Sequence, residues 1–181
     1  MKENDMETLR YCKIRKVKSP VRGTPVAGGI DFFVPEDIDV DTFADKCKTT
    51  GCYPSYTLDD DYKIKTIELK PGESVMIPSG IKMKVMDGHA LVFMNKSGIG
   101  AKKQLDVLAC LVDEDYRGEV HINLVNNGWR SQTIAAGDKI VQGVILKMNY
   151  ASPEEVANED VLYADSTSER GEGGFGSTGT K

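Results

Sequence analysis

The most regular feature of the sequence is a period of two in its hydrophobic positions, which is typical of strands that bury one face. Apolar residues alternate with polar ones along 81–85 and 120–124, and further apolar segments occur at 75–77, 90–94 and 139–148. Turn residues lie between these segments, at Pro78-Ser79-Gly80, Asp87-Gly88, Asn126-Asn127-Gly128 and Gly137-Asp138. Many short strands joined by tight turns predict an all-β fold, a jelly-roll-like sandwich or barrel.

Helix signals are few. Residues 39–46 are expected to form one or two helical turns with Asp39 or Asp41 as the cap, and Pro153–Val156 is expected to form another turn. The surrounding stretch, about 37–66, differs in character from the rest of the chain because it combines two cysteines, three tyrosines and an acidic triplet. We expect it to be an insertion of mixed character on the surface of the β domain.

The cysteines in that stretch, Cys47 and Cys52, are spaced like half of a metal site, but no second pair lies near them in the sequence. The favoured interpretation is a reduced pair in a surface loop. The alternative, a bound metal, stays open at this point.

Composition narrows the class of protein further. The 181 residues carry a net charge of −5, with 40% apolar and 28% charged side chains, which are ordinary values for a single globular domain. The longest apolar run, 107–112, is far shorter than the roughly 20 residues of a membrane span, and the polar N-terminus does not resemble a signal peptide. We therefore expect a cytoplasmic protein without a membrane or non-specific nucleic-acid partner.

The C-terminal segment, residues 166–181, is rich in glycine and poor in apolar residues, so it cannot bury enough surface to hold itself in place. It nevertheless carries Arg170, Phe175, Ser177 and Thr178 among five glycines. These are groups that bind phosphate and cover a ring. We expect a β domain over 1–165 followed by a flexible lid over a nucleotide triphosphate; the alternative is an idle Gly/Ser terminus.

Two further clusters carry candidate chemistry. One cluster follows a predicted strand and suits a turn that binds phosphate: Lys96, Ser97 and Gly98. The alternative is a solvent-exposed turn that carries a lysine, which would have a similar sequence. Asp113 follows the most apolar run of the chain, where partial desolvation favours a general base, and Tyr116 lies three residues on. The alternative there is a charged hairpin turn.

Five segments, in this order, resemble the motifs of the trimeric all-β dUTPase (deoxyuridine triphosphatase) family. Residues 27–32 are similar to A-G-x-D-L, 95–98 to P-R-S-G, 112–118 to I-D-x-D-Y-R-G, and 137–142 to G-D-R-I-A-Q. Residues 170–179 match R-G-x-G-G-F-G-S-T-G throughout. The resemblance covers about residues 12–36 and 66–179.

This resemblance implies a homotrimer with active sites shared between subunits and the hydrolysis of dUTP, with Mg²⁺, to dUMP and diphosphate. Such a reaction limits uracil in DNA and supplies dUMP for dTMP synthesis. By the same resemblance Asp113 activates water, Tyr116 packs on deoxyribose and Asp31 holds metal-bound waters. The substrate contacts that it implies are Lys96, Ser97, Gly98 and Gln142 at phosphates, Arg170, Ser177 and Thr178 at the terminal phosphates, Phe175 and Gly176 over the uracil, and the backbone of Leu108, Ala109 and Cys110 at the uracil edge.

The chain departs from the family pattern in three places. Asn95-Lys96 stands where the family has Pro-Arg. The lysine keeps the positive charge but lacks the guanidinium group that can form two parallel hydrogen bonds to a phosphate. Leu108 and Cys110 stand where many members have glycine. The third departure is the insertion at about 37–66, which nothing in the family pattern explains. The alternatives left open are a catalytically weak dUTP-binding regulatory protein and a dCTP deaminase of the same fold.

Overall fold

The computed structural model describes residues 8–169 and 171–173. These residues belong to two units, Met1–Met148 and Asn149–Lys181. The first unit carries all of the described strands and one α-helix, and the second carries one short helix. The elements are β1 Arg10–Lys13, β2 Val21–Arg22, β3 Ile30–Phe33, α1 Val40–Thr50, β4 Ser55–Leu58, β5 Ile64–Leu69, β6 Ser74–Pro78, β7 Ile81–Lys84, β8 His89–Asn95, the π-helical turn η1 Ile99–Lys103, β9 Leu105–Val107, β10 Leu111–Val112, β11 His121–Asn126, β12 Gln132–Ala135, β13 Lys139–Lys147 and α2 Glu159–Leu162.

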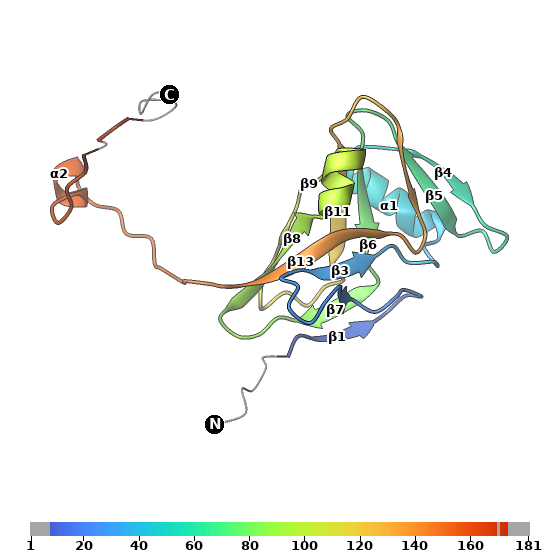
Figure 1. Cartoon of the computed structure of the whole chain (residues 1–181), viewed down its shortest axis with the longest axis horizontal. Coiled ribbons are helices and arrows are strands. Elements are labelled where there is room, and N and C mark those ends of the chain that lie inside the picture. Colours follow the sequence, from blue (N-terminus) through green and yellow to red (C-terminus); the bar gives the residue numbers. More distant parts are fainter. Residues whose placement is uncertain (1–7, 170, 174–181) are drawn as a thin grey trace. The chain divides into compact units, whose positions relative to one another are not determined.

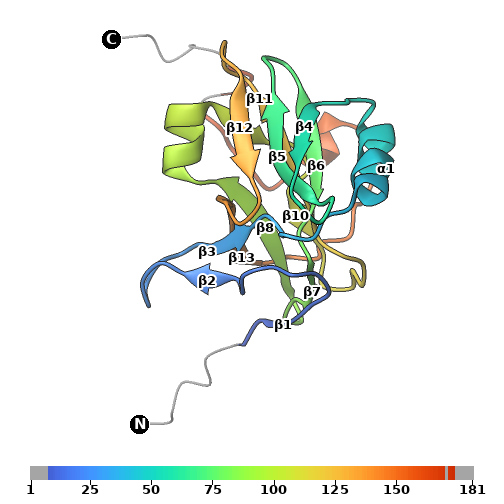
Figure 2. The same cartoon turned by 90° about the vertical axis from the view of Figure 1, so that its right-hand side faces the viewer.

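The strands pair only antiparallel, within four sheets (Figures 1 and 2). The largest sheet has the order β10-β8-β13-β3-β2, and the others are β6-β11-β9, β12-β5-β4 and β1-β7. Neighbours in these sheets are often distant in the sequence, as β13 and β3 are, so the topology is not a simple meander. This arrangement confirms the all-β, jelly-roll-like prediction.

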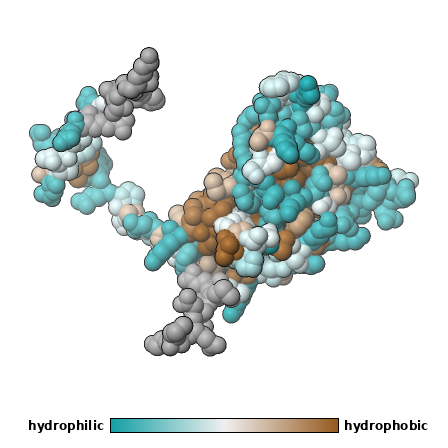
Figure 3. Space-filling view, in the orientation of Figure 1, coloured by the Kyte–Doolittle hydropathy of each residue, from teal (hydrophilic) through white to brown (hydrophobic). Residues whose placement is uncertain are grey.

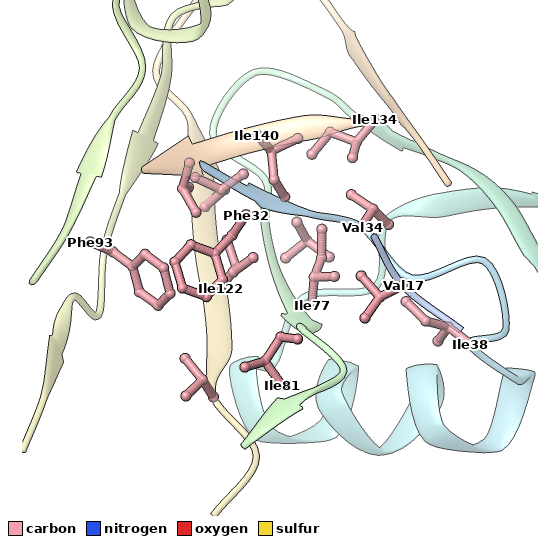
Figure 4. Packing of buried hydrophobic residues seen from close by; sticks show 14 of the residues in the cluster. Val17, Phe32, Val34, Ile38, Ile77, Ile81, Phe93, Ile122, Ile134 and Ile140 are labelled. Carbon is pink, nitrogen blue, oxygen red and sulfur yellow. The ribbon is translucent and has the colours of Figure 1, made fainter. Parts of the chain in front are cut away.

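The core lies between the sheets and contains large aliphatic and aromatic side chains from most strands of the first unit (Figure 4). Phe32 of β3 and Phe93 of β8 meet edge to face with ring centroids 5.0 Å apart. Gly143 of β13 lies beside them, and a Cβ at this position would meet the side chains of Leu91 and Phe32 at 2.9–3.0 Å. The strand that carries part of the candidate site is therefore packed tightly against the core.

Helix α1 is longer than the sequence pattern predicts. It begins after Asp39, whose Oδ1 accepts a hydrogen bond from the backbone N–H of Thr42 at 2.7 Å, and it ends at Gly51, which has a left-handed φ of 69°. Phe43 is 1% exposed and belongs to the hydrophobic core. The segment 37–66 is therefore not only a surface addition, because its helix completes the core.

The two cysteines of this segment are free thiols, but they do not form the expected surface-loop pair. Cys47 lies on α1 and is buried, and that burial, with Cys52 close by, raises the pKa of the Cys47 thiol. The Sγ atom of Cys52 accepts a hydrogen bond from the backbone N–H of Ser74 at 3.3 Å. Among the described residues, no group of three or more His, Cys, Asp or Glu side chains is placed to hold a metal ion.

The helical turn expected at Pro153–Val156 is absent, and the short helix α2 begins instead at Glu159, six residues after Pro153. Its cap explains the difference: the side chain of Asn158 accepts a hydrogen bond from the N–H of Val161 at 3.1 Å. A four-residue helix is marginal without such a cap. In the described part of the chain no helix is long and apolar enough to span a membrane.

Replacing Phe43 by alanine should reveal the contribution of α1 to the core. Because Phe43 is fully buried and also packs on Tyr56, the free energy of unfolding should fall by about 3–5 kcal/mol, measured by denaturant titration. The matched control is Tyr53→Ala in the same segment, where the side chain is 67% exposed and the loss should be small. Equal losses in the two variants would contradict a core role for the helix.

Candidate active site

A buried carboxylate organises the first half of the candidate site. Asp31, in the middle of β3, is 5% exposed, and its two oxygens are paired with Lys96 and Lys139. The Lys139 Nζ lies 2.9 Å from Oδ2, and the Lys96 Nζ contacts Oδ1. Burial alone would raise the pKa of Asp31, but hydrogen bonds from the two ammonium groups outweigh it and hold that pKa below its usual range.

A β-bulge places two residues of β13 on the Asp31 side of the sheet. Lys139 and Gln142 are three residues apart, so a regular strand would point them to opposite faces. The register with β3 shifts between Lys139 and Val141, which places Gln142 opposite Asp31 while Lys139 reaches the same carboxylate. Gly29 leaves room for the Gln142 amide in this position, because a Cβ on residue 29 would overlap it and force that side chain to move.

The segment after β8 is fixed by Asn95. Its side-chain oxygen accepts from the N–H of Val107 at 3.0 Å, its amide nitrogen donates to Asp106, and its carbonyl accepts from Gln142 Nε2 at 2.9 Å. The carbonyl of Lys96 then accepts from Gly100 at 2.8 Å at the start of η1. The exposed Ser97 and Gly98 lie between Asn95 and this turn, so a rigid frame presents them to solvent.

The second half of the site is a cavity of about 180 Å³. It brings together four residues that the sequence analysis selected: Ala109, Cys110, Asp113 and Tyr116. Leu108 does not line it, although it belongs to the same hairpin and is 51% exposed. The remaining lining residues are Phe93, Leu111, Val112, Val120 and His121.

Tyr116 is held against the backbone of its own loop. Its hydroxyl donates to the carbonyl of Glu119 at 2.9 Å, and its ring occupies the space that a Cβ on Gly118 would fill. This explains the glycine two residues after the tyrosine. Asp113 is exposed in the single chain, so its own strand does not supply the desolvation that the sequence analysis invoked.

The predicted site residues thus fall into two groups. Asp31, Lys96 and Gln142 cluster at the end of β8 and along β3 and β13. Ala109, Cys110, Asp113 and Tyr116 line the cavity, whose walls include no member of the first cluster. Five others lie outside the described residues: Arg170, Phe175, Gly176, Ser177 and Thr178.

The sequence analysis gave no role to several residues that the fold brings to these groups. Lys139 stands in the same motif as Gln142, but its role depends on a bulge that periodicity does not reveal. Asn95 departs from the family pattern, and its hydrogen bonds to three neighbours appear only in the fold. In the sequence His121 is a polar position of an alternating strand, and its place in the cavity wall follows from tertiary packing.

The face of the five-stranded sheet that carries Asp31 is apolar beside the charged cluster. Directly paired residues of antiparallel strands share a face, and the row Met94, Gln142, Asp31 and Val21 lies beside the row Leu111, Val92 and Val144. Met94 and Leu111 are 51% and 53% exposed, and Figure 3 shows apolar surface gathered over this part of the first unit. Exposed patches of this kind mark interaction surfaces.

Comparison with known proteins gives consistent matches. The family model for dUTPase matches residues 59–179. A deoxyuridine 5'-triphosphate nucleotidohydrolase of Gloeothece citriformis is 36% identical over 141 residues, which are 74% of this chain and 93% of that protein. The corresponding protein of Caulobacter vibrioides is 43% identical over 115 residues, or 62% of this chain and 70% of the relative.

Solved structures share the fold at lower identity. A variant dUTPase of Staphylococcus bacteriophage 80alpha, with dUpNHpp, matches with a TM-score of 0.69 at 21% identity and covers 95% of this chain and 98% of its own. A variant dUTPase from phage phi11 of S. aureus, described as revealing the coordination of a structural Mg(II) ion, matches with a TM-score of 0.62 at 18% identity and covers 85% and 99%.

Replacing Asp31 by asparagine should reduce stability in a pH-dependent way. Because the pKa of Asp31 is lowered by folding, its contribution is complete above the unfolded value of about 3.9 and is lost as the pH falls through the folded value. The free energy of unfolding should drop by roughly 1–3 kcal/mol at pH 7. The difference from wild type should shrink in strong acid.

Asp87→Asn is the control, because its 3.6 Å ion pair with Lys84 is exposed on both sides. It should leave the pH profile of unfolding unchanged. A constant difference between Asp31→Asn and wild type at every pH would contradict the ion-pair account.

Proposed function

Because this chain belongs to the dUTPase family, we propose that it hydrolyses dUTP to dUMP and diphosphate by attack of water on the α-phosphorus. One observation carries the proposal beyond family membership: Asp113, Tyr116 and the hairpin residues Ala109 and Cys110 line one cavity of about 180 Å³. An engineered protein cavity of about 150 Å³ accommodates benzene. The cavity therefore has room for a single six-membered ring such as a pyrimidine.

In this mechanism Asp113 takes a proton from the attacking water, and the bond from the α-phosphorus to the bridging oxygen breaks to release diphosphate. Tyr116 packs on the deoxyribose and disfavours a 2′-hydroxyl. Lys96, Ser97, Gly98 and Gln142 contact phosphate oxygens, and the backbone near Leu108, Ala109 and Cys110 meets the base. We assign the terminal phosphates to Arg170, Ser177 and Thr178 and the cover over the uracil to Phe175 and Gly176.

Magnesium is the proposed cofactor, and the donor set is compatible with it. Mg²⁺ keeps several waters and binds through few carboxylates when a triphosphate supplies other oxygens. Asp31 has lone pairs beyond those used by the two lysines, so it can accept hydrogen bonds from metal-bound waters. The ion would neutralise charge on the triphosphate.

A homotrimer with shared sites is the proposed assembly. The apolar face of the large sheet, with Met94, Leu111 and Leu146 each close to half exposed, needs a partner surface, and Asp31 lies in the same face. The second half of the site is a separate cavity. Association of copies would bring the cations of one subunit to the Asp113 cavity of another. The cytoplasmic location that we expect fits a reaction that keeps uracil out of DNA.

The role of Asp113 is tested by Asp113→Asn. The variant should bind dUTP with Mg²⁺ while kcat falls by roughly 10²–10⁴, the usual contribution of a general base. Asp115→Asn, the same chemical change two residues away, should keep near-normal turnover. Product analysis with dUTP and dCTP separates the alternatives: release of ammonia would indicate a deaminase, and binding without turnover in wild type would indicate a regulator.

Shared sites are tested by mixing two nearly inactive proteins, Asp113→Asn and a chain that lacks 170–181. After joint unfolding and refolding, mixed trimers should recover part of the activity, because some sites combine an intact Asp113 with an intact C-terminal segment. Activity is followed by diphosphate release, and mixing is verified with an affinity tag on one variant. Tagged mixed trimers without activity would place base and C-terminal segment in the same subunit.

A further inference from the structure

His121 occupies an unusual place in the cavity. It is the first residue of β11, and it lines the same cavity as Asp113, Tyr116 and Cys110. Its Nε2 atom is buried and has no hydrogen-bond partner among the described residues. Leaving a buried polar atom unpaired costs about 1–3 kcal/mol, so such an atom next to a cavity calls for an explanation.

The groups around His121 keep its ring neutral. Burial lowers the pKa of His121, and Lys46 of helix α1 lowers it further. Glu119 and Arg15 also face the ring, but they form an ion pair with each other, with Arg15 Nε 2.8 Å from Glu119 Oε1. The backbone of Glu119 acts against this lowering of the pKa. Because Nε2 has no partner among the described residues, we assign the ring proton to Nδ1. Nε2 therefore presents a lone pair.

The hairpin that we assign to the base is partly occupied by the fold itself. The N–H of Leu108 donates to the carbonyl of Asn123 at 3.0 Å, and the carbonyl of Cys110 accepts from Phe93 at 2.8 Å. These two backbone groups are therefore engaged within the chain. Fewer main-chain groups remain to distinguish one pyrimidine from another, and a side chain in the wall can add to the discrimination.

We propose that His121 is a specificity-determining residue of this site, with Nε2 accepting a hydrogen bond from the N3–H of uracil. Cytosine has an unprotonated N3, which would face the Nε2 lone pair and be repelled. Nε2 is shielded from solvent in the free chain, so the side chain must adjust when the base enters, as side chains at binding sites commonly do. This inference rests on the proposed function.

The test compares His121→Leu with wild type, using dUMP and dCMP as competitive inhibitors of dUTP hydrolysis. Loss of the acceptor should raise the KM for dUTP and the inhibition constant of dUMP by roughly 3–30-fold, with kcat changed much less. The preference for dUMP over dCMP should fall by a similar factor. His121→Gln, whose amide oxygen can accept the same bond, should recover part of the preference, and a purely structural role predicts no such recovery.

His89→Leu is the control, because the only other histidine in the sequence lies outside this cavity. It should leave the ratio of the two inhibition constants unchanged. An unchanged ratio in a folded His121→Leu, checked by its melting temperature, would overturn the inference and leave the proposed function intact. Wild type that hydrolyses no dUTP would instead overturn the proposed function.

A measurement on the unaltered protein covers the case in which His121→Leu does not fold. Inhibition by deoxyuridine, which has no phosphate to titrate, should weaken as the pH falls below the ordinary range of histidine, because protonation removes the Nε2 lone pair. The lowered pKa of His121 places this change in the acid range. Inhibition that is constant down to the acid limit of folding would contradict the proposal.

Discussion

The ion pair cluster of Asp31 is the constraint on which the first half of the site depends. A buried carboxylate is tolerated only when it is paired and hydrogen-bonded, so Asp31 needs both Lys96 and Lys139. These lysines come from the end of β8 and the start of β13, and the carboxylate therefore fixes three strands relative to one another. Two cations around one anion leave a net positive charge at a defined place, which suits a phosphate.

The separation of the two halves follows from the same fold. The bulge in β13 and the tight packing at Gly143 hold the cations on the outer face of the large sheet. The loop after β10 meanwhile directs Asp113 and Tyr116 into a cavity whose wall contains none of those cations. A nucleoside triphosphate needs base, sugar and phosphate contacts at the same time. The proposed assembly through the apolar face would meet this requirement by bringing the two halves of the site together.

Local pattern predicted the strands near 75–77, 81–85, 90–94, 120–124 and 139–148, because alternation and turn residues are encoded within a few positions, but it did not predict short strands such as β4 and β12. The strand around Ile122 and the Asp39 cap are examples. Features that depend on tertiary contacts could not be predicted from the local sequence. Nothing in the sequence of α1 alone shows that Cys47 faces the core, and the π-helical turn after Asn95 arises from hydrogen bonds within and beyond the turn. Within the site, the sequence identified the residues that belong to motifs. The roles of Lys139 and His121 depend on the bulge and on the cavity, which only the structure reveals.

The insertion and the cavity are physically connected, and this gives the extra segment a role that its composition did not suggest. Helix α1 packs on β6, which pairs with β11, and Lys46 on this helix faces His121 at the start of β11. A cation in this position disfavours protonation of the imidazole and so preserves the lone pair on Nε2. The Phe43 side chain anchors the same helix in the core. The helix that completes the core thus also adds to the effect of burial in lowering the pKa of His121. If His121 has the proposed role in base selection, changes in the segment 37–66 would alter substrate preference without touching the substrate.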